Sequence, residues 1–185
     1  MISDKKIVLG SSSPRRQELL KMIVKDFEIR TKSIEEIFNE KKPEKIVEEI
    51  AIKKMNVLEA KDKEIIITAD TIVSLEDEIL LKPNSKENAI KYLNSLKNNW
   101  HQVYTGICIK KDTKKEIFSV KTDVHFIDFD FETLLYYIEN YNVYDKAGGY
   151  GIQDFGAVFI DKIIGDYYNI MGLPISELYS RLKNI

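Results

Sequence analysis

The feature that most limits the fold is the run "IIITAD", residues 65–70, which is apolar except for Thr68 up to its final carboxylate. A short apolar run of this kind is typical of a buried strand. We therefore expect a strand that ends at Asp70. α/β proteins usually place ligands at the C-terminal ends of such strands. Asp70 is then either a ligand-binding carboxylate or a turn residue that caps the next backbone segment, and both interpretations stay open.

Strand-like and helix-like segments alternate along the rest of the chain. Further strands are predicted at 6–10, 27–31, 100–111 and 115–129, and in the segment after residue 156. Helices are predicted from Pro14, over roughly Pro43 to Lys61, at 85–98, at 131–141 and at the C-terminus. A hairpin is expected to turn near Glu76 and Asp77. Strand–helix units with a meander between them indicate an α/β fold with two lobes and a cleft.

Length and charge exclude some classes of partner. The 185 residues suffice for one large domain or for two small lobes that share a cleft. The formal net charge of -2 argues against a protein that coats a nucleic acid or a membrane. The apolar run near the N-terminus is too short for a signal peptide, and no stretch approaches the roughly 18 apolar residues of a membrane span. We expect a cytoplasmic protein whose polyanionic ligands meet a local basic cluster.

Cysteine and histidine give little sign of a metal site. Cys108 is the only cysteine, so one chain can form neither a disulfide nor a metal site built from several thiolates. It lies in an alternating, strand-like stretch, which favours a packed residue over a reactive one. His101 and His125 lie far apart without metal-ligand spacing. We expect both histidines to be packed or on the surface.

The stretch "LGSSSPRRQELL", residues 9–20, concentrates hydrogen-bond donors where a strand gives way to a helix. Unpaired N–H groups and the positive end of the helix dipole meet at such a turn. The serine hydroxyls together with Arg15 and Arg16 would suit a phosphate. The alternative is a serine N-cap beside two surface arginines. The stretch is not a Walker loop, because the required glycines and the GK[ST] ending are missing.

A lysine falls on the apolar face of the helix predicted from Pro43. The residues of that face recur at helical spacing and are Ile46, Val47, Ile50, Ala51, Met55 and Leu58. Lys54 lies on this face, whereas Lys53 points away. A lysine in such a place either extends to the rim or meets a buried anion.

Three further features carry polar chemistry. Glu36 lies in an acidic loop, and Lys82 follows the predicted hairpin. The stretch "DKAGGYGIQDFG", residues 145–156, contains four glycines, which allow close backbone approach or positive φ. Within it, the amide of Gln153 can donate to and accept from the edge of a base. Basic groups bind phosphates and carboxylates hold Mg²⁺, so the inventory fits a nucleoside triphosphate–metal complex.

Five stretches resemble the Maf family of nucleotide pyrophosphatases and occur in that family's order. They are "SSSPRRQELL" at 11–20, "ADTIV" at 69–73, "LKP" at 81–83, "YDKAGGYGIQ" at 144–153 and "MGLP" at 171–174. The resemblance spans the chain and implies a single Maf-like domain over residues 1–185. Its fold would be the two-lobed Maf/ITPase-like α/β fold, with a central mixed sheet flanked by helices and one cleft between the lobes.

The resemblance also implies an activity. Maf proteins hydrolyse a nucleoside triphosphate to its monophosphate and pyrophosphate with a divalent metal, Mg²⁺ or Mn²⁺, and are often cytosolic homodimers. The implied catalytic residues are Arg16, Glu36, Lys54, Asp70 and Lys82, of which Glu36 and Asp70 would hold the metal. The implied substrate-binding residues are Ser11, Arg15, Thr71, Lys146 and Gln153.

Within the family, three positions resemble the branch that acts on dTTP and UTP. The branch that acts on 7-methylguanosine triphosphate tends to have tryptophan in place of Arg15 and glutamate in place of Gln153, and it differs at Thr71. Two positions depart from the family pattern: Met55 replaces a small residue, and Asp154 replaces a glycine. Modified pyrimidine nucleotides are further candidate substrates.

Two other functions stay open. One is a nucleotide-binding regulator of cell division or septum formation that does not turn its ligand over. Two carboxylates near basic groups argue against it, because a protein that merely binds an anion gains little from acidic groups. The other is a housecleaning pyrophosphatase for non-canonical purine triphosphates, which would keep the chemistry and change the base.

Overall fold

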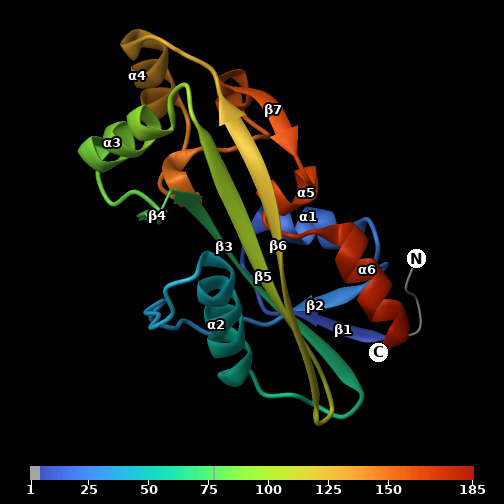
Figure 1. The fold of residues 1–185 in the computed structure, drawn as a ribbon. Coiled ribbons are helices and arrows are strands. Elements are labelled where there is room, and N and C mark those ends of the chain that lie inside the picture. Colours follow the sequence, from blue (N-terminus) through green and yellow to red (C-terminus); the bar gives the residue numbers. More distant parts are fainter. Residues whose placement is uncertain (1–4, 77) are drawn as a thin grey trace. The chain divides into compact units, whose positions relative to one another are not determined.

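The computed structural model describes residues 5–76 and 78–185, and it divides the chain into two compact units (Figure 1). Unit 1 contains the described residues up to Thr71 together with Thr105–Val120 and Gly172–Ile185. Unit 2 contains Ile72–Tyr104 and Lys121–Met171. A single domain with one shared cleft stays a prediction. None of the described helices is both long and apolar enough to span a membrane.

In the described part of the chain, seven strands form a mixed sheet in the order β2-β1-β3-β5-β6-β7, with β4 beside β3. The strands are β1 (Lys6–Leu9), β2 (Phe27–Ile29), β3 (Glu64–Leu75), β4 (Glu78–Leu80), β5 (Trp100–Lys111), β6 (Lys114–Phe126) and β7 (Ile160–Ile164). β1 is parallel to β2 and β3, whereas β4 is antiparallel to β3, and β7 is antiparallel to β6. The mixed sheet expected from the sequence is confirmed.

The five predicted helices are present, and the short helix α5 and two 3-10 helices were not predicted. The helices are α1 (Pro14–Lys21), α2 (Pro43–Asn56), α3 (Lys86–Leu96), α4 (Phe131–Asn140), α5 (Tyr167–Ile170) and α6 (Ile175–Asn184), with short 3-10 helices η1 (Ala147–Gly149) and η2 (Phe155–Phe159). Proline at the first position and a serine cap explain the start of α1, since the Ser13 hydroxyl accepts from the N–H of Arg16.

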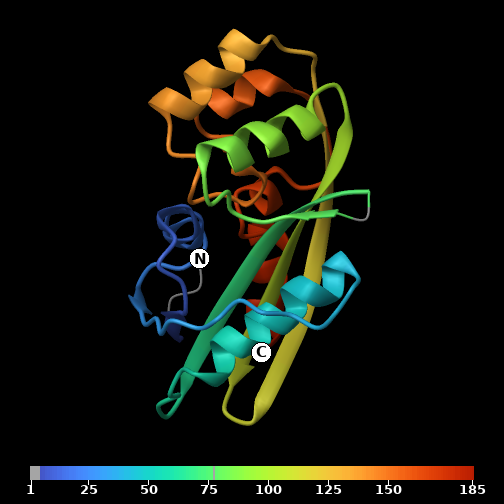
Figure 2. The same cartoon turned by 90° about the vertical axis from the view of Figure 1, so that its left-hand side faces the viewer.

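In unit 1, α2 lies on one face of the sheet and α6 on the other (Figures 1 and 2). The residues buried beneath α2 come from four elements and from the turn after the helix, and they are Val8, Ala51, Met55, Leu58, Ile66 and Cys108. The helix lies so close to β5 that a Cβ at Gly106 would come within 2.4 Å of the Val47 carbonyl carbon. Cys108 is fully buried, as predicted.

The predicted end of α2 at Lys61 is wrong, because the helix ends at Asn56. The backbone beyond it is held by side chains from other segments. The carbonyl of Glu59 accepts from Arg30 at 2.7 Å, and the N–H of Lys61 donates to Glu64 at 2.9 Å. The contact with Arg30 joins residues distant in sequence, and local periodicity contains no sign of it.

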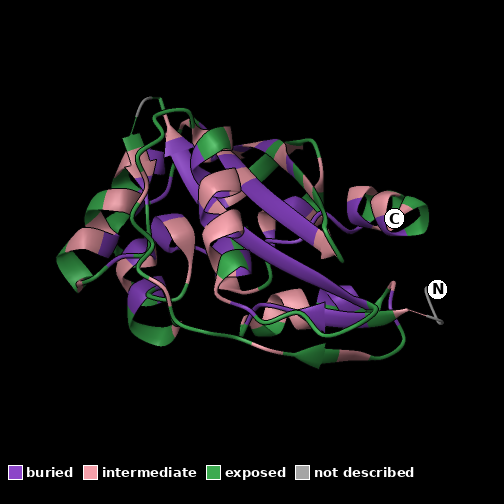
Figure 3. Cartoon of the chain, turned by 90° about the horizontal axis from the view of Figure 1, so that it is seen from below, coloured by how far each residue is buried: buried purple, intermediate pink, exposed green. Residues whose placement is uncertain are grey.

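The predicted strand end at Asp70 is also wrong. β3 continues through Asp70 to Leu75 and is buried along most of its length (Figure 3). Asp70 is therefore not a turn residue. The antiparallel pairing of β3 with β4 confirms the hairpin, and Glu76 lies in its turn. Asp77 lies outside the described residues.

Unit 2 has an aromatic core of its own. Tyr137 on α4 contacts the rings of Tyr141 and Phe159, and Phe126 on β6 contacts Phe159 and Tyr150. Aliphatic residues of β3, β4, α3 and β5 complete this core. The glycine-rich stretch therefore packs against a rigid support within its own unit.

Candidate functional site

Asp70 is a buried carboxylate of unit 1, with 6% of its surface exposed. It shares the α2-facing side of β3 with Thr68, whose hydroxyl donates to the carbonyl of Ala51 at 2.7 Å. Burial raises the pKa of Asp70 above its ordinary value of 3.8, while the positive charges of Lys54 and Arg16 act in the opposite direction. A carboxylate in this state accepts a proton more readily than an exposed one.

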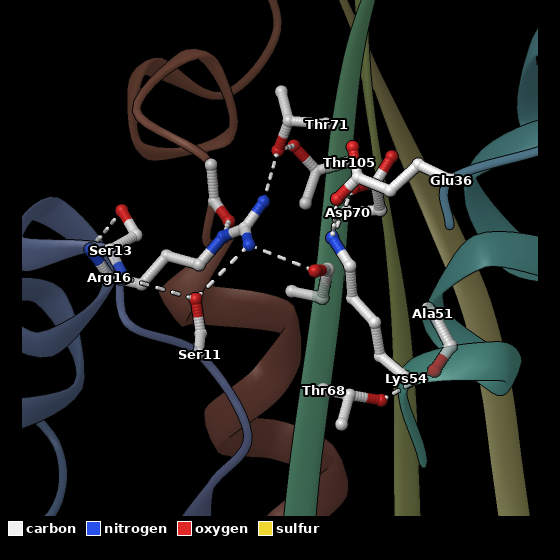
Figure 4. Close-up of polar contacts among 12 residues, drawn as sticks. Ser11, Ser13, Arg16, Glu36, Ala51, Lys54, Thr68, Asp70, Thr71 and Thr105 are labelled. Atoms are coloured by element: carbon white, nitrogen blue, oxygen red, sulfur yellow. Dashed lines mark hydrogen bonds and ion pairs between the residues drawn. The ribbon is translucent and has the colours of Figure 1, made fainter. Parts of the chain in front are cut away.

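Lys54 joins two carboxylates from different segments (Figure 4). Its ammonium nitrogen lies 2.6 Å from Asp70 Oδ1 and 2.7 Å from Glu36 Oε1. Of the two alternatives for a lysine on an apolar helix face, contact with a buried anion is therefore confirmed. Lys53 pairs with Glu49 at 2.6 Å, away from this cluster, as predicted. Glu36 comes from an irregular segment and joins the cluster only through folding.

Arg16 approaches β3 from the side of α1, whereas Lys54 approaches it from the side of α2 (Figure 4). Its Nε donates to the carbonyl of Gly172 and its Nη1 to the carbonyl of Ala69, both at 2.8 Å. Its Nη2 donates to the Thr71 hydroxyl at 2.9 Å. Burial lowers the pKa of the guanidinium. Arg16 is therefore anchored in the site, and the alternative of a surface arginine is wrong for it.

The hydrogen bonds of the Ser11 hydroxyl leave it free to act only as a further donor. Its oxygen accepts from Arg16 Nη1 at 3.2 Å and from the backbone N–H of Ser13 at 3.3 Å. These two bonds use both lone pairs of the oxygen, so the hydroxyl hydrogen is left to donate elsewhere. A buried O–H that can only donate suits an anion such as phosphate. The N-cap role and the donor role thus fall on different serines, Ser13 and Ser11.

Sequence reasoning missed two contributors to this cluster. Thr105 on β5 lies 3.0 Å from the hydroxyl of Thr71, and no pattern in its alternating strand distinguishes it. Gly172 supplies a carbonyl to Arg16 from the stretch "MGLP". That stretch carried the family resemblance, but its role could not be read from residue type. Arg15 precedes Arg16 on α1 and is half-buried.

The other predicted site residues belong to unit 2. Lys82 is exposed and follows β4, and Gln153 is exposed in the glycine-rich segment. The carbonyl of Leu81 accepts from the N–H of Gly148 at 3.1 Å, so the structure brings the "LKP" stretch and the glycine-rich segment together. The side chain of Lys146 is largely buried, with its nitrogen 2.8 Å from Asp145. The roles assigned to these residues stay predictions.

The donor set at Lys54 fits a hard divalent cation. Mg²⁺ is usually bound by one or two carboxylates together with substrate phosphates. Asp70 and Glu36 supply two carboxylates that already converge on one positive charge. Among the residues that the structure describes, no group of three His, Cys, Asp or Glu side chains could hold a metal.

Comparison with known sequences identifies the family. The sequence model of the family described as Maf-like protein matches residues 6–185. The chain belongs to the Maf family. A dTTP/UTP pyrophosphatase of Thermosipho africanus is 42% identical over 177 residues, covering 96% of this chain and 92% of that protein. A dTTP/UTP pyrophosphatase of Flavobacterium johnsoniae is 44% identical over 184 residues, covering 97% of this chain and 95% of that protein.

Solved structures share the fold of this Maf-family chain. The Staphylococcus aureus Ham1 protein matches with a TM-score of 0.58 at 18% identity, covering 97% of this chain and 99% of that one. A HAM1 protein from Coxiella burnetii matches with a TM-score of 0.53 at 15% identity, covering 100% of both chains. At these identities the likeness concerns the fold alone. It confirms the α/β class with a central mixed sheet.

Proposed function

We propose that this protein hydrolyses nucleoside triphosphates, dTTP and UTP foremost, to the monophosphate and pyrophosphate. The observation that carries the proposal is the contact of Asp70 and Glu36 with one lysine, Lys54, in a chain of the Maf family. The activity named for the relatives described above supports the choice of substrate. Arg15, Thr71 and Gln153 support the same choice, since they resemble the dTTP/UTP branch.

In the proposed reaction, Asp70 orients a water molecule toward the α-phosphorus and takes its proton. The new bond joins the water oxygen to the α-phosphorus, and the bond from that phosphorus to the bridging oxygen breaks. Pyrophosphate leaves with the electron pair of the broken bond. The raised pKa of Asp70 supports its role as the base.

The basic side chains offset the negative charge of the triphosphate. We assign Ser11 and Arg16 to the phosphates, because the Ser11 O–H is left to donate and Arg16 holds the serine oxygen. Lys54 and Lys82 would stabilise charge on the transferred group and on the leaving pyrophosphate. Lys146 is assigned to substrate binding, and Gln153 to the edge of the pyrimidine. One donor and one acceptor on the amide match that edge.

Asp70 and Glu36 would hold a divalent cation, Mg²⁺ or Mn²⁺. When bound, such a cation offsets phosphate charge and lowers the pKa of a coordinated water. We further propose a homodimer that acts in the cytoplasm, as the family resemblance implies. Light scattering on the purified protein tests the dimer, and cell fractionation tests the location.

The deciding experiment measures pyrophosphate release from dTTP, UTP, CTP, GTP, ITP and 7-methyl-GTP, with Mg²⁺ or Mn²⁺ and with neither. We expect fast, metal-dependent turnover of dTTP and UTP that is lost in Asp70→Asn. Turnover confined to ITP would indicate a housecleaning enzyme for purine nucleotides. Binding of nucleotide without release from any of the six would refute hydrolysis and favour a regulator.

A further inference from the structure

The hydroxyl of Tyr137 ties α4 to the glycine-rich segment of unit 2. Tyr137 is fully buried, yet both hydrogen-bonding functions of its hydroxyl are used. The oxygen accepts from the N–H of Gly151 at 2.9 Å, and the O–H donates to Asp154 Oδ1 at 2.9 Å. These two partners flank Gln153 in the sequence. A single hydroxyl on a rigid helix thus binds the backbone before the predicted base-contacting residue and the side chain of the residue that follows it.

The carboxylate of Asp154 makes two further contacts within the same unit. Its Oδ1 also accepts from the N–H of Gly156 at 2.9 Å, which caps η2. Its Oδ2 lies 3.4 Å from the ammonium nitrogen of Lys146. Lys146 also donates to the carbonyl of Asn142. One carboxylate therefore links α4, η2 and Lys146, and we call Tyr137 with Asp154 the latch.

The space around the latch explains two of the glycines. A Cβ at Gly151 would lie 2.6 Å from Lys146 Cε and 2.7 Å from Asp154 Oδ2. A Cβ at Gly156 would lie 2.9 Å from the Tyr137 hydroxyl and 2.6 Å from the carbonyl oxygen of Gly151. Any larger residue would push the latch apart. These two glycines are therefore needed for close packing of the unit's own side chains.

We propose that Tyr137 and Asp154 are positioning residues that hold Gln153 in place for the base of the substrate. The proposal rests on the proposed function for Gln153 and extends it to residues that never touch the nucleotide. A segment held in its binding conformation before the ligand arrives loses less conformational entropy on binding. A mobile segment would bind more weakly and would discriminate less between bases.

The test compares Tyr137→Phe with Tyr136→Phe, the neighbouring tyrosine whose side chain is exposed. In Tyr137→Phe we expect the KM for UTP to rise about tenfold while kcat stays within about twofold, since only preorganisation is lost. The preference for UTP over CTP should shrink. Inhibition by pyrophosphate, which has no base, should be unchanged. Tyr136→Phe should match the wild type in all four measurements.

A second pair of variants guards against simple loss of folding. Asp154→Asn keeps an oxygen that can accept from Gly156 and Tyr137, so it should retain most of the base preference. Asp154→Ala should lose that preference. Thermal unfolding shows whether each variant is folded. An unchanged KM and an unchanged base preference in folded Tyr137→Phe would overturn the proposal, as would equal loss in Asp154→Asn and Asp154→Ala.

Binding measurements separate this proposal from the proposed hydrolysis. In the Asp70→Asn background, calorimetry gives the affinity for dTTP without turnover. We expect Tyr137→Phe to weaken that affinity about tenfold. If Tyr137→Phe weakens binding but the wild type releases no pyrophosphate, hydrolysis is refuted and the positioning role of the latch is supported. If the wild type releases pyrophosphate but Tyr137→Phe does not weaken binding, hydrolysis is supported and the positioning role of the latch is refuted.

Discussion

Two buried carboxylates on the same strand of unit 1 have opposite environments. Glu64 begins β3, and Asp70 follows it on the same strand. Glu64 accepts from both Nη atoms of Arg30, at 2.8 and 3.0 Å, and from Lys6 at 3.0 Å. The hydrogen bonds from Arg30 hold the pKa of Glu64 far below its ordinary range, even though burial opposes them. Asp70 has its pKa raised by burial.

The difference separates a carboxylate that serves the fold from one that serves chemistry. Glu64 is matched by charged donors and ties together β1, β3 and the turn after α2, so its ionised form stabilises the unit. The negative charge of Asp70 is buried with fewer positive partners, because the ammonium group of Lys54 also pairs with Glu36. Groups that burial keeps from their preferred charge state gather at functional sites. The following predictions test this contrast.

The largest effect is expected at Asp70. Asp70→Asn should lower the rate of pyrophosphate release by about 10³-fold, because an amide can neither take a proton nor bind a cation well. The midpoint of thermal unfolding should not fall, since the variant removes a carboxylate whose ionised form is disfavoured by burial. The rate and the midpoint are measured on the same preparation. A large fall in the midpoint would place Asp70 with Glu64 as a structural carboxylate.

The opposite result is expected at Glu64. Glu64→Gln should lower the free energy of unfolding by about 3 kcal/mol, because it removes the buried charge that binds both Nη atoms of the partly buried Arg30 guanidinium. The kcat and KM should stay near the wild-type values. Glu28→Gln is the matched control: Glu28 binds the same Arg30 at 2.8 Å but is 44% exposed, so the loss should stay below about 1 kcal/mol. Urea unfolding provides the measurement, and equal losses in both variants would contradict the role of burial.

A smaller effect on activity is expected at Lys54. Lys54→Met should lower kcat/KM about 30-fold, since it removes a positive charge from the site while keeping the apolar stem. Lys45→Met is the control on the same helix, because Lys45 pairs with Glu48 at 2.7 Å and its side chain is 55% exposed. Steady-state kinetics with UTP should show no change in the control. Equal effects in the two variants would indicate that activity depends on the total positive charge of α2 and not on the contact of Lys54 with Asp70.

The smallest effects are expected in the dependence of stability on pH. The depressed pKa of Glu64 means that its stabilisation is present above the ordinary value of 4.5 and is lost as pH falls toward the folded value. The difference in free energy of unfolding between the wild type and Glu64→Gln should therefore become smaller below pH 4.5. The raised pKa of Asp70 has the opposite sign: its contribution is present below 3.8 and is lost as pH rises through the folded value.

Asp70→Asn should therefore gain stability relative to wild type as pH rises from 3.8. The gain is limited to about 1.4 kcal/mol per pH unit for one proton. Unfolding in urea across a pH series measures both differences. A gain that is absent, or that appears on acidification, would show that Lys54 compensates the charge of Asp70 completely.

Local sequence patterns alone predicted most of the strands and helices and two candidate site residues. The apolar run before Asp70, the proline and serine that begin α1 and the helical spacing that singled out Lys54 all depend on neighbours in the sequence. Their consequences are physical and short-range: a short apolar run forms a buried strand, and a capped turn starts a helix. Sequence reasoning could therefore place most elements and name Asp70 and Lys54 as candidate site residues, but it did not pair them with each other.

Tertiary structure alone decided how these residues meet. Glu36 contacts Lys54 from an irregular segment. Arg16 donates to the backbone carbonyls of Ala69 and Gly172, and because every residue has a carbonyl, residue type does not identify these acceptors. The same holds for the continuation of β3 past Asp70. Such contacts depend on the packing of segments distant in sequence, and the free energy of that packing is a property of the whole unit. No local periodicity encodes it.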